Sequence, residues 1–319
     1  MFSRNAVSLM TLSLLTRNVR GCSSSVKNVS IYTFISNLCH NPDIIFLQET
    51  CHLNAQFPSW TSWRNYTPLC NPSPSRGSGI TTLLKNSITI LETCSVYDGF
   101  ITYTKILSSN SLYHLYNVLI PQQNSEALNA IKSFLKHSSP ISDGVMIVGG
   151  DFNCTLDPNL DRLGTPTEHR PQISMALRNA MARLSLCDVW RRQNPNVKSY
   201  TWHRNNPSNQ YGVSKARLDR LYIPKSFLSL TNSCNILPCS LSDHSTVTIT
   251  LQPPSTNSYK RSAYWHFITP CLRTTHTNKS LKTFGQVGEK NGTIFPIFVS
   301  GGISEKPKLK HSLKCMLQK

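Results

Sequence analysis

Two apolar runs limit the folds that are open to this chain of 319 residues. After their first residue, residues 43–47 (DIIFL) and residues 144–148 (GVMIV) are apolar at every position. Strands of this kind are covered on both faces, by helices or by a second sheet. Residues 246–251 (TVTITL) instead alternate strictly, which is typical of a half-buried antiparallel strand. The two patterns together predict stacked layers with a sheet in the interior.

Five further runs are rich in β-branched and aromatic residues and are bounded by Gly, Pro, Asn or Ser. These runs are residues 11–16, 79–84, 100–106, 112–120 and 217–223. Helical periodicity is found in residues 125–137, where Ser125 is the predicted N-cap, and in residues 171–186, which open with Pro171. Strands with interspersed helices predict an α/β sandwich of two sheets.

The pattern of elements ends near residue 252, where the sequence reads QPPS. We therefore expect a short N-terminal extension (residues 1–9), one domain (residues 10–252) and a tail (residues 253–319). The apolar stretch in residues 9–15 is too short and too polar for a membrane span. The tail is basic and without periodicity, so we expect disorder, or the frameshifted remnant of a helical linker.

The net charge is +18, and half of this excess lies in the tail, which holds 11 Lys and Arg against two acids. A second basic stretch, residues 162–225, carries 12 basic residues against Glu168, Asp188 and Asp219. Such a stripe suits a nucleic-acid backbone, although a solvated basic face would have the same composition. The 11 cysteines contain no C-x-x-C pair, so a disulfide framework or a structural zinc site is not expected.

Polar residues recur at the ends of the predicted strands. In chain order the motifs are RNVRG with Asn18, FLQET with Glu49, VGGDFN with Asp151 and Asn153, ARLDRLY with Asp219, and LSDHS with Asp243 and His244. Each one alone is typical of a strand-end charge or a turn. The two glycines before Asp151 are more specific, because they indicate a tight turn or a close approach of the backbone.

Together these residue types match the needs of phosphodiester hydrolysis. That reaction needs a metal ion to neutralise developing phosphate charge, a group that aligns or deprotonates water, and donors to the phosphate oxygens. Carboxylates with an Asn amide are hard ligands, which favour Mg²⁺, or Mn²⁺, over zinc. A His held by an Asp can donate to a phosphate as imidazolium.

The ordered motif set over about residues 10–251 resembles the endonuclease/exonuclease/phosphatase superfamily, which includes exonuclease III, the apurinic endonucleases and deoxyribonuclease I. Finer features are similar to the endonuclease domain of non-LTR retrotransposon polyproteins. They are RGSGI at residues 76–80, DVW-x-x-x-NP at 188–195, YTW at 200–202 and RLDR at 217–220. The resemblance implies a four-layer α/β sandwich, in which two mixed β-sheets are flanked by helices.

The resemblance also implies roles for the matched positions. Glu49 is the expected main metal ligand, with Asn18 and Asp243 in support. Asp151 is expected to align or deprotonate water with the help of Asn153, and His244, held by Asp219, to contact the scissile phosphate. Thr201 and Ser242 match accessory positions near the site. The residues expected to contact DNA are Arg191, Arg192, Thr201, Arg204, Lys215, Arg217 and Arg220.

Two positions depart from the wider superfamily. Leu119, in VLIP, stands where members carry a Tyr that reaches the phosphate, and Tyr116 is the nearest substitute. Losing that hydroxyl costs about 10²-fold in rate by analogy with oxyanion donors. Arg20 stands where many apurinic endonucleases carry Asp, which favours the retrotransposon branch.

We therefore expect a Mg²⁺-dependent endonuclease that nicks DNA, leaves a 3′-hydroxyl, acts as a monomer and needs neither a membrane nor a small-molecule cofactor. Its expected place of action is the nucleus, although no targeting signal is clear. The alternatives are an apurinic, exonuclease III-type repair enzyme and a catalytically decayed nucleic-acid-binding domain. A lipid phosphatase is disfavoured, because the basic stripe suits an extended duplex better than a headgroup.

Overall fold

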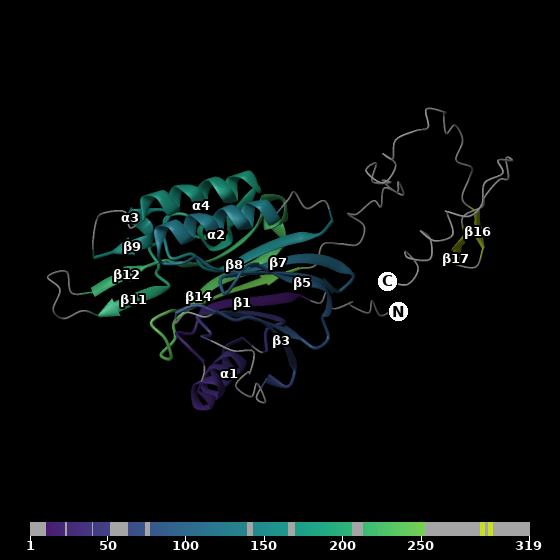
Figure 1. The fold of residues 1–319 in the computed structure, drawn as a ribbon, viewed down its shortest axis with the longest axis horizontal. Coiled ribbons are helices and arrows are strands. Elements are labelled where there is room, and N and C mark those ends of the chain that lie inside the picture. Colours follow the sequence, from purple (N-terminus) through teal and green to yellow (C-terminus); the bar gives the residue numbers. More distant parts are fainter. Residues whose placement is uncertain are drawn as a thin grey trace, which may run out of the picture. The chain divides into compact units, whose positions relative to one another are not determined.

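The computed structural model describes residues 11–22, 24–39, 41–51, 63–73, 77–138, 143–164, 170–205, 213–252, 288–290 and 293–295 (Figure 1). The expected N-terminal extension, residues 1–9, lies outside these ranges, and so does most of the expected tail. The chain divides into two compact units, Met1–Lys260 and Arg261–Lys319. In the second unit the structure describes one antiparallel pair, β16 (Gly288–Lys290) and β17 (Thr293–Phe295).

The first unit contains two six-stranded mixed sheets. One has the strand order β14-β15-β1-β2-β4-β3, and the other has the order β10-β13-β8-β7-β6-β5. The strands of the first sheet are β1 (Leu12–Asn18), β2 (Ile44–Gln48), β3 (Tyr66–Asn71), β4 (Ile80–Lys85), β14 (Thr231–Leu237) and β15 (Thr246–Leu251). Those of the second are β5 (Thr89–Tyr97), β6 (Ile101–Ser108), β7 (Ser111–Leu119), β8 (Val145–Asp151), β10 (Leu186–Asp188) and β13 (Asp219–Pro224).

Alternating side chains of these strands fill three apolar layers. Leu14, Phe46 and Ile147 belong to the core between the two sheets. On the outer face of the first sheet, Leu15 and Leu47 pack against Ile31 of α1 (Ser25–Cys39). The outer face of the second sheet is covered by α2 (Asn124–His137) and α4 (Pro171–Arg183). The result is the expected four-layer sandwich, helix–sheet–sheet–helix (Figure 1).

Smaller elements complete the first unit. They are α3 (Pro158–Asp161), α5 (Val189–Gln193), the 3₁₀ helix η2 (Lys225–Leu230) and a three-stranded sheet of β9 (Arg162–Leu163), β11 (Trp202–Asn205) and β12 (Val213–Ala216). Strands β11 and β12 are antiparallel, and Lys215 of β12 lies opposite both His203 of β11 and Leu163 of β9.

Each strand predicted from the sequence has a counterpart, and all five residues of β2 are buried, as its apolar run requires. One local prediction is wrong: Ser125 is not an N-cap, because α2 begins at Asn124 after Gln123 and has no side-chain cap. The sequence did not predict α1. Its residues (SVKNVSIYTFISNLC) mix β-branched and polar side chains without a clear apolar stripe, so tertiary packing decides this helix.

Candidate active site

Strand ends from both sheets meet at one end of the sandwich. Asn18 is the last residue of β1, and Glu49 follows β2, its parallel neighbour. Asp151 ends β8 and lies directly opposite Asp219, the first residue of β13. His244 precedes β15 and bridges to β11 at Trp202. Five residues spread over the sequence are therefore brought to one place, as the motif order predicts.

The backbone before Asp151 needs glycine at two positions. A Cβ on Gly150, whose φ is +148°, would collide with the carbonyl oxygen of Val118. A Cβ on Gly149 would collide with Leu221 and approach Phe46 of the opposite sheet. The close approach predicted from the two glycines is thus real, because they let β8 pack tightly against β7 and against the other sheet just before the catalytic candidate.

Asn18 joins the two sheets through its side-chain amide. Its Nδ2 donates to Glu49 Oε1 at 2.8 Å and to Asp151 Oδ2 at 2.9 Å. Its Oδ1 accepts the backbone N–H of Arg20 at 3.0 Å, which fixes which end of the amide carries the oxygen. Asn18 therefore presents a donor to the carboxylates in this structure, and not the oxygen that a metal ligand uses.

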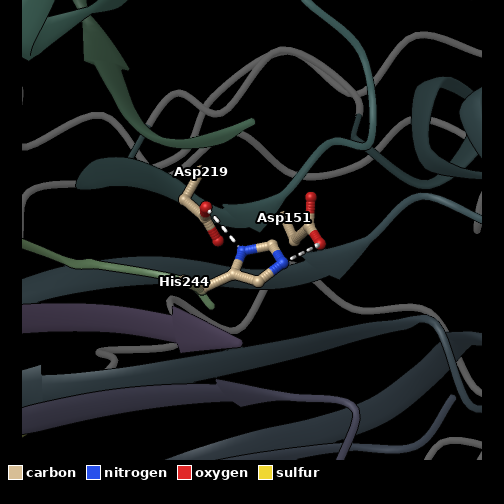
Figure 2. A group of neighbouring side chains, drawn as sticks. All are labelled: Asp151, Asp219 and His244. Atoms are coloured by element: carbon tan, nitrogen blue, oxygen red, sulfur yellow. Dashed lines mark hydrogen bonds and ion pairs between the residues drawn. The ribbon is translucent and has the colours of Figure 1, made fainter. Parts of the chain in front are cut away.

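His244 lies between two buried carboxylates (Figure 2). Its Nδ1 is 2.9 Å from Asp219 Oδ2, and its Nε2 is 4.0 Å from Asp151 Oδ2. Burial alone would lower the pKa of His244, but the charge of Asp219, its hydrogen bond and the charge of Asp151 outweigh burial and raise the pKa to about 9. The ring is therefore an imidazolium at neutral pH, and the proton on Nε2 lies too far from Asp151 for a hydrogen bond.

Asp151 and Asp219 hold more negative charge than their neighbours neutralise. Burial and then the charge of Asp219 raise the pKa of Asp151, against the opposing charge of His244. Asp219 Oδ1 is buried and has no hydrogen-bond partner. Ligand atoms of Asp151, Asp219 and His244 lie within 4.8 Å of one another, a spacing that can hold a metal ion. A protonated His cannot bind a metal, so an ion on all three residues would have to displace the proton.

Two predicted accessory residues position this group. Thr201 is buried, and its Oγ1 accepts the backbone N–H groups of Leu218 and Asp219, both at 2.9 Å. The prediction that Thr201 contacts DNA is therefore wrong, because the side chain instead fixes the start of β13. Ser242 Oγ donates to the carbonyl of Asn18 at 3.0 Å and so joins the β15 loop to β1.

Glu49 and Asp243, the other two predicted metal ligands, both contact Arg20. Its Nε and Nη2 donate to the two oxygens of Asp243, both at 3.0 Å, and its Nη1 lies 3.7 Å from Glu49 Oε1. Trp202 Nε1 also donates to Asp243 Oδ2, at 2.9 Å. Burial on its own would raise the pKa of Asp243, but the hydrogen bond and charge of Arg20 lower it.

A cavity of about 760 Å³ opens beside this group. Its wall includes His244 and Asn153 of the predicted catalytic set, and Arg204 and Lys215 of the predicted DNA-binding set. Arg192 is exposed but does not line the cavity. Asn153 Nδ2 donates to the carbonyl of Ile120 at 2.8 Å, which holds the side chain at the cavity wall.

Three of the predicted DNA-binding arginines are instead structural. Arg217 and Arg220 are each 1% exposed and, unlike His244, neither lines the cavity, so neither can reach a phosphate bound there. Arg217 binds Asp161 through Nε at 2.7 Å and Asp188 through Nη1 at 2.6 Å. Arg191 binds Asp161 at 2.6 Å and donates to three backbone carbonyls. The prediction failed because charge in a sequence does not reveal which cations are buried.

Other cavity residues were not singled out in the sequence. Arg170 donates to Asn124 Oδ1 and to the carbonyls of Asn153 and Pro121, at 2.8–3.0 Å. Arg162 also lines the cavity. Both arginines lie within the basic stretch 162–225, so the sequence indicated that basic residues of this region could bind DNA. It could not show which of them line the cavity, because that depends on how α3 and α4 pack.

The structure also places Leu119, the departure from the superfamily Tyr, and Tyr116, its nearest substitute in sequence. Leu119 is 1% exposed and pairs with Asp151 in the parallel ladder of β7 and β8. Tyr116, the nearest hydroxyl in sequence, packs in the apolar layer beside α2, and its hydroxyl lies 3.1 Å from His137 Nδ1. Tyr116 therefore does not replace the missing hydroxyl at the site.

Residues 16–244 match the endonuclease/exonuclease/phosphatase family. The chain belongs to this family. Among curated proteins, an uncharacterized 149 kDa protein of transposon TX1 from Xenopus laevis is 31% identical over 277 residues, which are 86% of this chain and 20% of that protein. The chain thus spans about a fifth of the length of this relative.

Solved structures of apurinic endonucleases share the family fold. The Leishmania major enzyme has a TM-score of 0.59 at 19% identity, over 76% of this chain and 88% of that chain. An Archaeoglobus fulgidus enzyme has a TM-score of 0.61 at 17% identity, over 75% and 99%. The catalytic domain of Xenopus laevis APE2 has a TM-score of 0.59 at 18% identity, over 76% and 92%. No described helix of the present chain is long and apolar enough to cross a membrane.

Proposed function

We propose that this family member is a divalent-metal-dependent phosphodiesterase that nicks one strand of DNA and leaves a 3′-hydroxyl, as the endonuclease of a retrotransposon-type element. The observation that carries the proposal is the convergence of Asn18, Glu49, Asp151, Asp219 and His244 beside one basic cavity. The transposon TX1 relative supports the retrotransposon branch. In an intact element the new 3′-hydroxyl would prime reverse transcription.

The residues present fit a hard divalent cation. Glu49, Asp151, Asp219 and Asp243 bring four carboxylates together, and among the described residues the cations in ion-pair contact with them are Arg20 and His244. Arg17 and Arg170 act on Asp219 and Asp151 at longer range. The orphan oxygen of Asp219 also indicates unneutralised charge. Glu49 would hold the ion with support from Asp243, Asn18 would position Glu49 through its Nδ2 group, and Mg²⁺ or Mn²⁺ suits such carboxylate ligands. The ion would neutralise charge that develops on the phosphate.

The chain's own side chains supply the remaining functions. Asp151 aligns the attacking water and accepts its proton, and burial raises its pKa toward the range of a general base. Asn153 orients the water from the cavity wall. His244 donates its Nε2 proton to an oxygen of the scissile phosphate, while Asp219 holds the opposite ring nitrogen at 2.9 Å. Arg204 and Lys215 attract the DNA backbone along the cavity.

A plasmid-nicking assay tests the proposal. Residues 1–260, which form a compact unit with the whole site, and the full chain should both convert supercoiled plasmid to open circles with Mg²⁺ or Mn²⁺. EDTA should abolish the conversion, and so should His244→Ala. Nicked ends should be extendable by a polymerase without end repair, because they carry a 3′-hydroxyl. Metal-independent nicking, or full activity of His244→Ala, would refute the site assignment.

The same assay separates the repair-type alternative. An apurinic endonuclease would cut a duplex with one abasic site far faster than the same duplex with an intact base, whereas the proposed enzyme cuts both at similar rates. A decayed domain would bind both duplexes and cut neither. We also propose that the enzyme acts as a monomer and in the nucleus, where chromosomal DNA is found.

A further inference from the structure

Arg20 contacts each of the three residues to which a metal-holding role is assigned. Its backbone N–H occupies Asn18 Oδ1 at 3.0 Å. Its guanidinium binds both oxygens of Asp243 and lies 3.7 Å from Glu49 Oε1. One residue therefore neutralises or occupies all three expected ligands. Removal of the guanidinium would leave Glu49 and Asp243 without this positive charge.

The backbone here is built to hold Arg20 at this position. Arg20 (φ +51°) and Glu49 (φ +53°) both adopt the left-handed conformation that is rare for residues with a Cβ. Gly21 N donates to the carbonyl of Glu49 at 2.7 Å, which locks the two loops together. Strained positions of this kind persist where the surroundings enforce them, often at functional sites.

The guanidinium is held, but it is not buried. The side chain of Arg20 is 39% exposed and that of Asp243 is 35% exposed. Water screens both charges of this bidentate pair, so it costs less to open than a buried ion pair would. Arg20 also lines the cavity with His244, Arg204 and Lys215. Once released from Asp243, its guanidinium remains at the mouth of the cavity that is proposed to receive DNA.

We propose that Arg20 couples metal binding to DNA binding. In the metal-free protein its guanidinium substitutes for the divalent cation at Glu49 and Asp243. A bound ion displaces it, and the freed guanidinium then binds a DNA phosphate beside the scissile bond. This inference rests on the proposed function, because it needs both a metal ion and a DNA substrate at the site.

The first test measures metal affinity without DNA. Mn²⁺ binding to the full chain is followed by electron paramagnetic resonance or calorimetry for the wild type, Arg20→Gln, Arg20→Lys and Arg204→Gln. Arg20→Gln should bind Mn²⁺ about 3- to 10-fold more tightly, because a partly exposed competing cation is lost. Arg20→Lys keeps the charge and should stay near the wild type. Arg204→Gln removes a cavity charge that has no contact with these carboxylates, and should not change Mn²⁺ affinity.

The second test measures DNA affinity with Ca²⁺, chosen as a divalent probe that is expected to bind without turnover, and with EDTA. Arg20→Gln should match the wild type in EDTA, where the guanidinium is held by Asp243, and should bind DNA several-fold more weakly in Ca²⁺. Arg204→Gln should weaken DNA binding equally in both conditions. The difference between the two variants identifies a charge that the metal releases, since a permanent DNA contact would not depend on the metal.

Three outcomes decide the proposal. Unchanged or weaker Mn²⁺ affinity in Arg20→Gln overturns the competition, and equal loss of DNA affinity in Ca²⁺ and EDTA overturns the coupling. A thermal melt like that of the wild type shows that Arg20→Gln is folded. If it is not, Arg20→Asn, which also lacks the charge and tolerates the left-handed backbone, carries the comparison. If the wild type binds no Mn²⁺, the proposed function and this inference are both refuted. If the wild type binds Mn²⁺ and Arg20→Gln binds it with the same affinity, this inference alone is refuted.

Discussion

Two clusters of acidic residues lie near the same end of the sandwich, and their negative charges are neutralised to different extents. In the first, which we call the arginine cluster, Asp161 and Asp188 meet Arg191, Arg217 and Arg220. In the second, the active-site cluster, Glu49, Asp151, Asp219 and Asp243 meet Arg20 and His244. The arginine cluster has an excess of cations among the described residues, and the active-site cluster has an excess of acids.

The difference is visible in the pKa of one buried carboxylate from each cluster, Asp161 and Asp151. Burial raises the pKa of both, but at Asp161 the charges of Arg217 and Arg220 outweigh burial, so the pKa falls well below its usual range. At Asp151 burial and the charge of Asp219 outweigh the opposing charge of His244, so the pKa rises. Asp161 therefore stabilises the fold as an anion, whereas Asp151 is left with a charge that an added cation would neutralise.

The largest expected effect is a loss of nicking activity when an acid of the active-site cluster, Asp151, is replaced. Asp151→Asn should lower the rate of plasmid nicking by about 10³-fold, because it removes the proton acceptor of the attacking water. It should not lower stability, because a buried charge with a raised pKa costs free energy when it is ionised. The nicking rate and a urea denaturation curve measure the two quantities. A strong loss of stability with little loss of activity would place Asp151 with the structural acids.

Asp161→Asn is the matched change in the arginine cluster. It should lower the free energy of unfolding by about 3–5 kcal/mol, because it leaves Arg217 buried without its main partner. Activity per folded molecule should stay near the wild type, since Asp161 is hydrogen-bonded within the arginine cluster. Urea denaturation and nicking at a temperature well below the transition test this. If the variant were as stable as the wild type, the arginine cluster would not be the structural element described here.

The pH profile sharpens the description of the active-site cluster. The pKa of His244 rises from 6.5 to about 9 on folding, so its protonation stabilises the fold. That contribution is complete below pH 6.5 and is lost as the pH rises through about 9. Nicking should decline over the same range as His244 loses its donor proton. In Asp219→Asn the decline should begin at lower pH, since the main charge that raises the pKa is gone. A profile that is flat up to pH 10 would contradict a protonated His244.

The smallest expected effect concerns the cavity wall. Arg204→Ala should weaken DNA binding about 3- to 10-fold and reduce the salt dependence of the affinity by about one counterion. Lys132→Ala, which removes an exposed charge on α2 away from the cavity, serves as the control. Affinities measured between low and moderate salt give both numbers. Equal losses in the two variants would mean that the net charge of the protein, and not the cavity, attracts DNA.

Local patterns were sufficient to predict much of this molecule. The apolar runs at residues 43–47 and 144–148 could only be covered strands, and the strict alternation of Thr246–Leu251 fixed an antiparallel strand. The residues after these strands were also predictable, because strand ends present side chains at a common edge. Helix α1 and the edge strand β5 were not, because their side chains carry no strong periodicity and their packing is set by neighbours far away in the sequence.

The sequence by itself determined which residues meet at the candidate site: Asn18, Glu49, Asp151, Asp219 and His244 are found together, as their motifs predict. Tertiary structure alone decided what surrounds each charge. It buried Arg217 and Arg220 among acids and left Arg204 at the cavity, although all three belong to one basic stretch. The reason is physical: the cost of burying a charge depends on the partners that folding brings within hydrogen-bond distance, and those partners are remote in the chain.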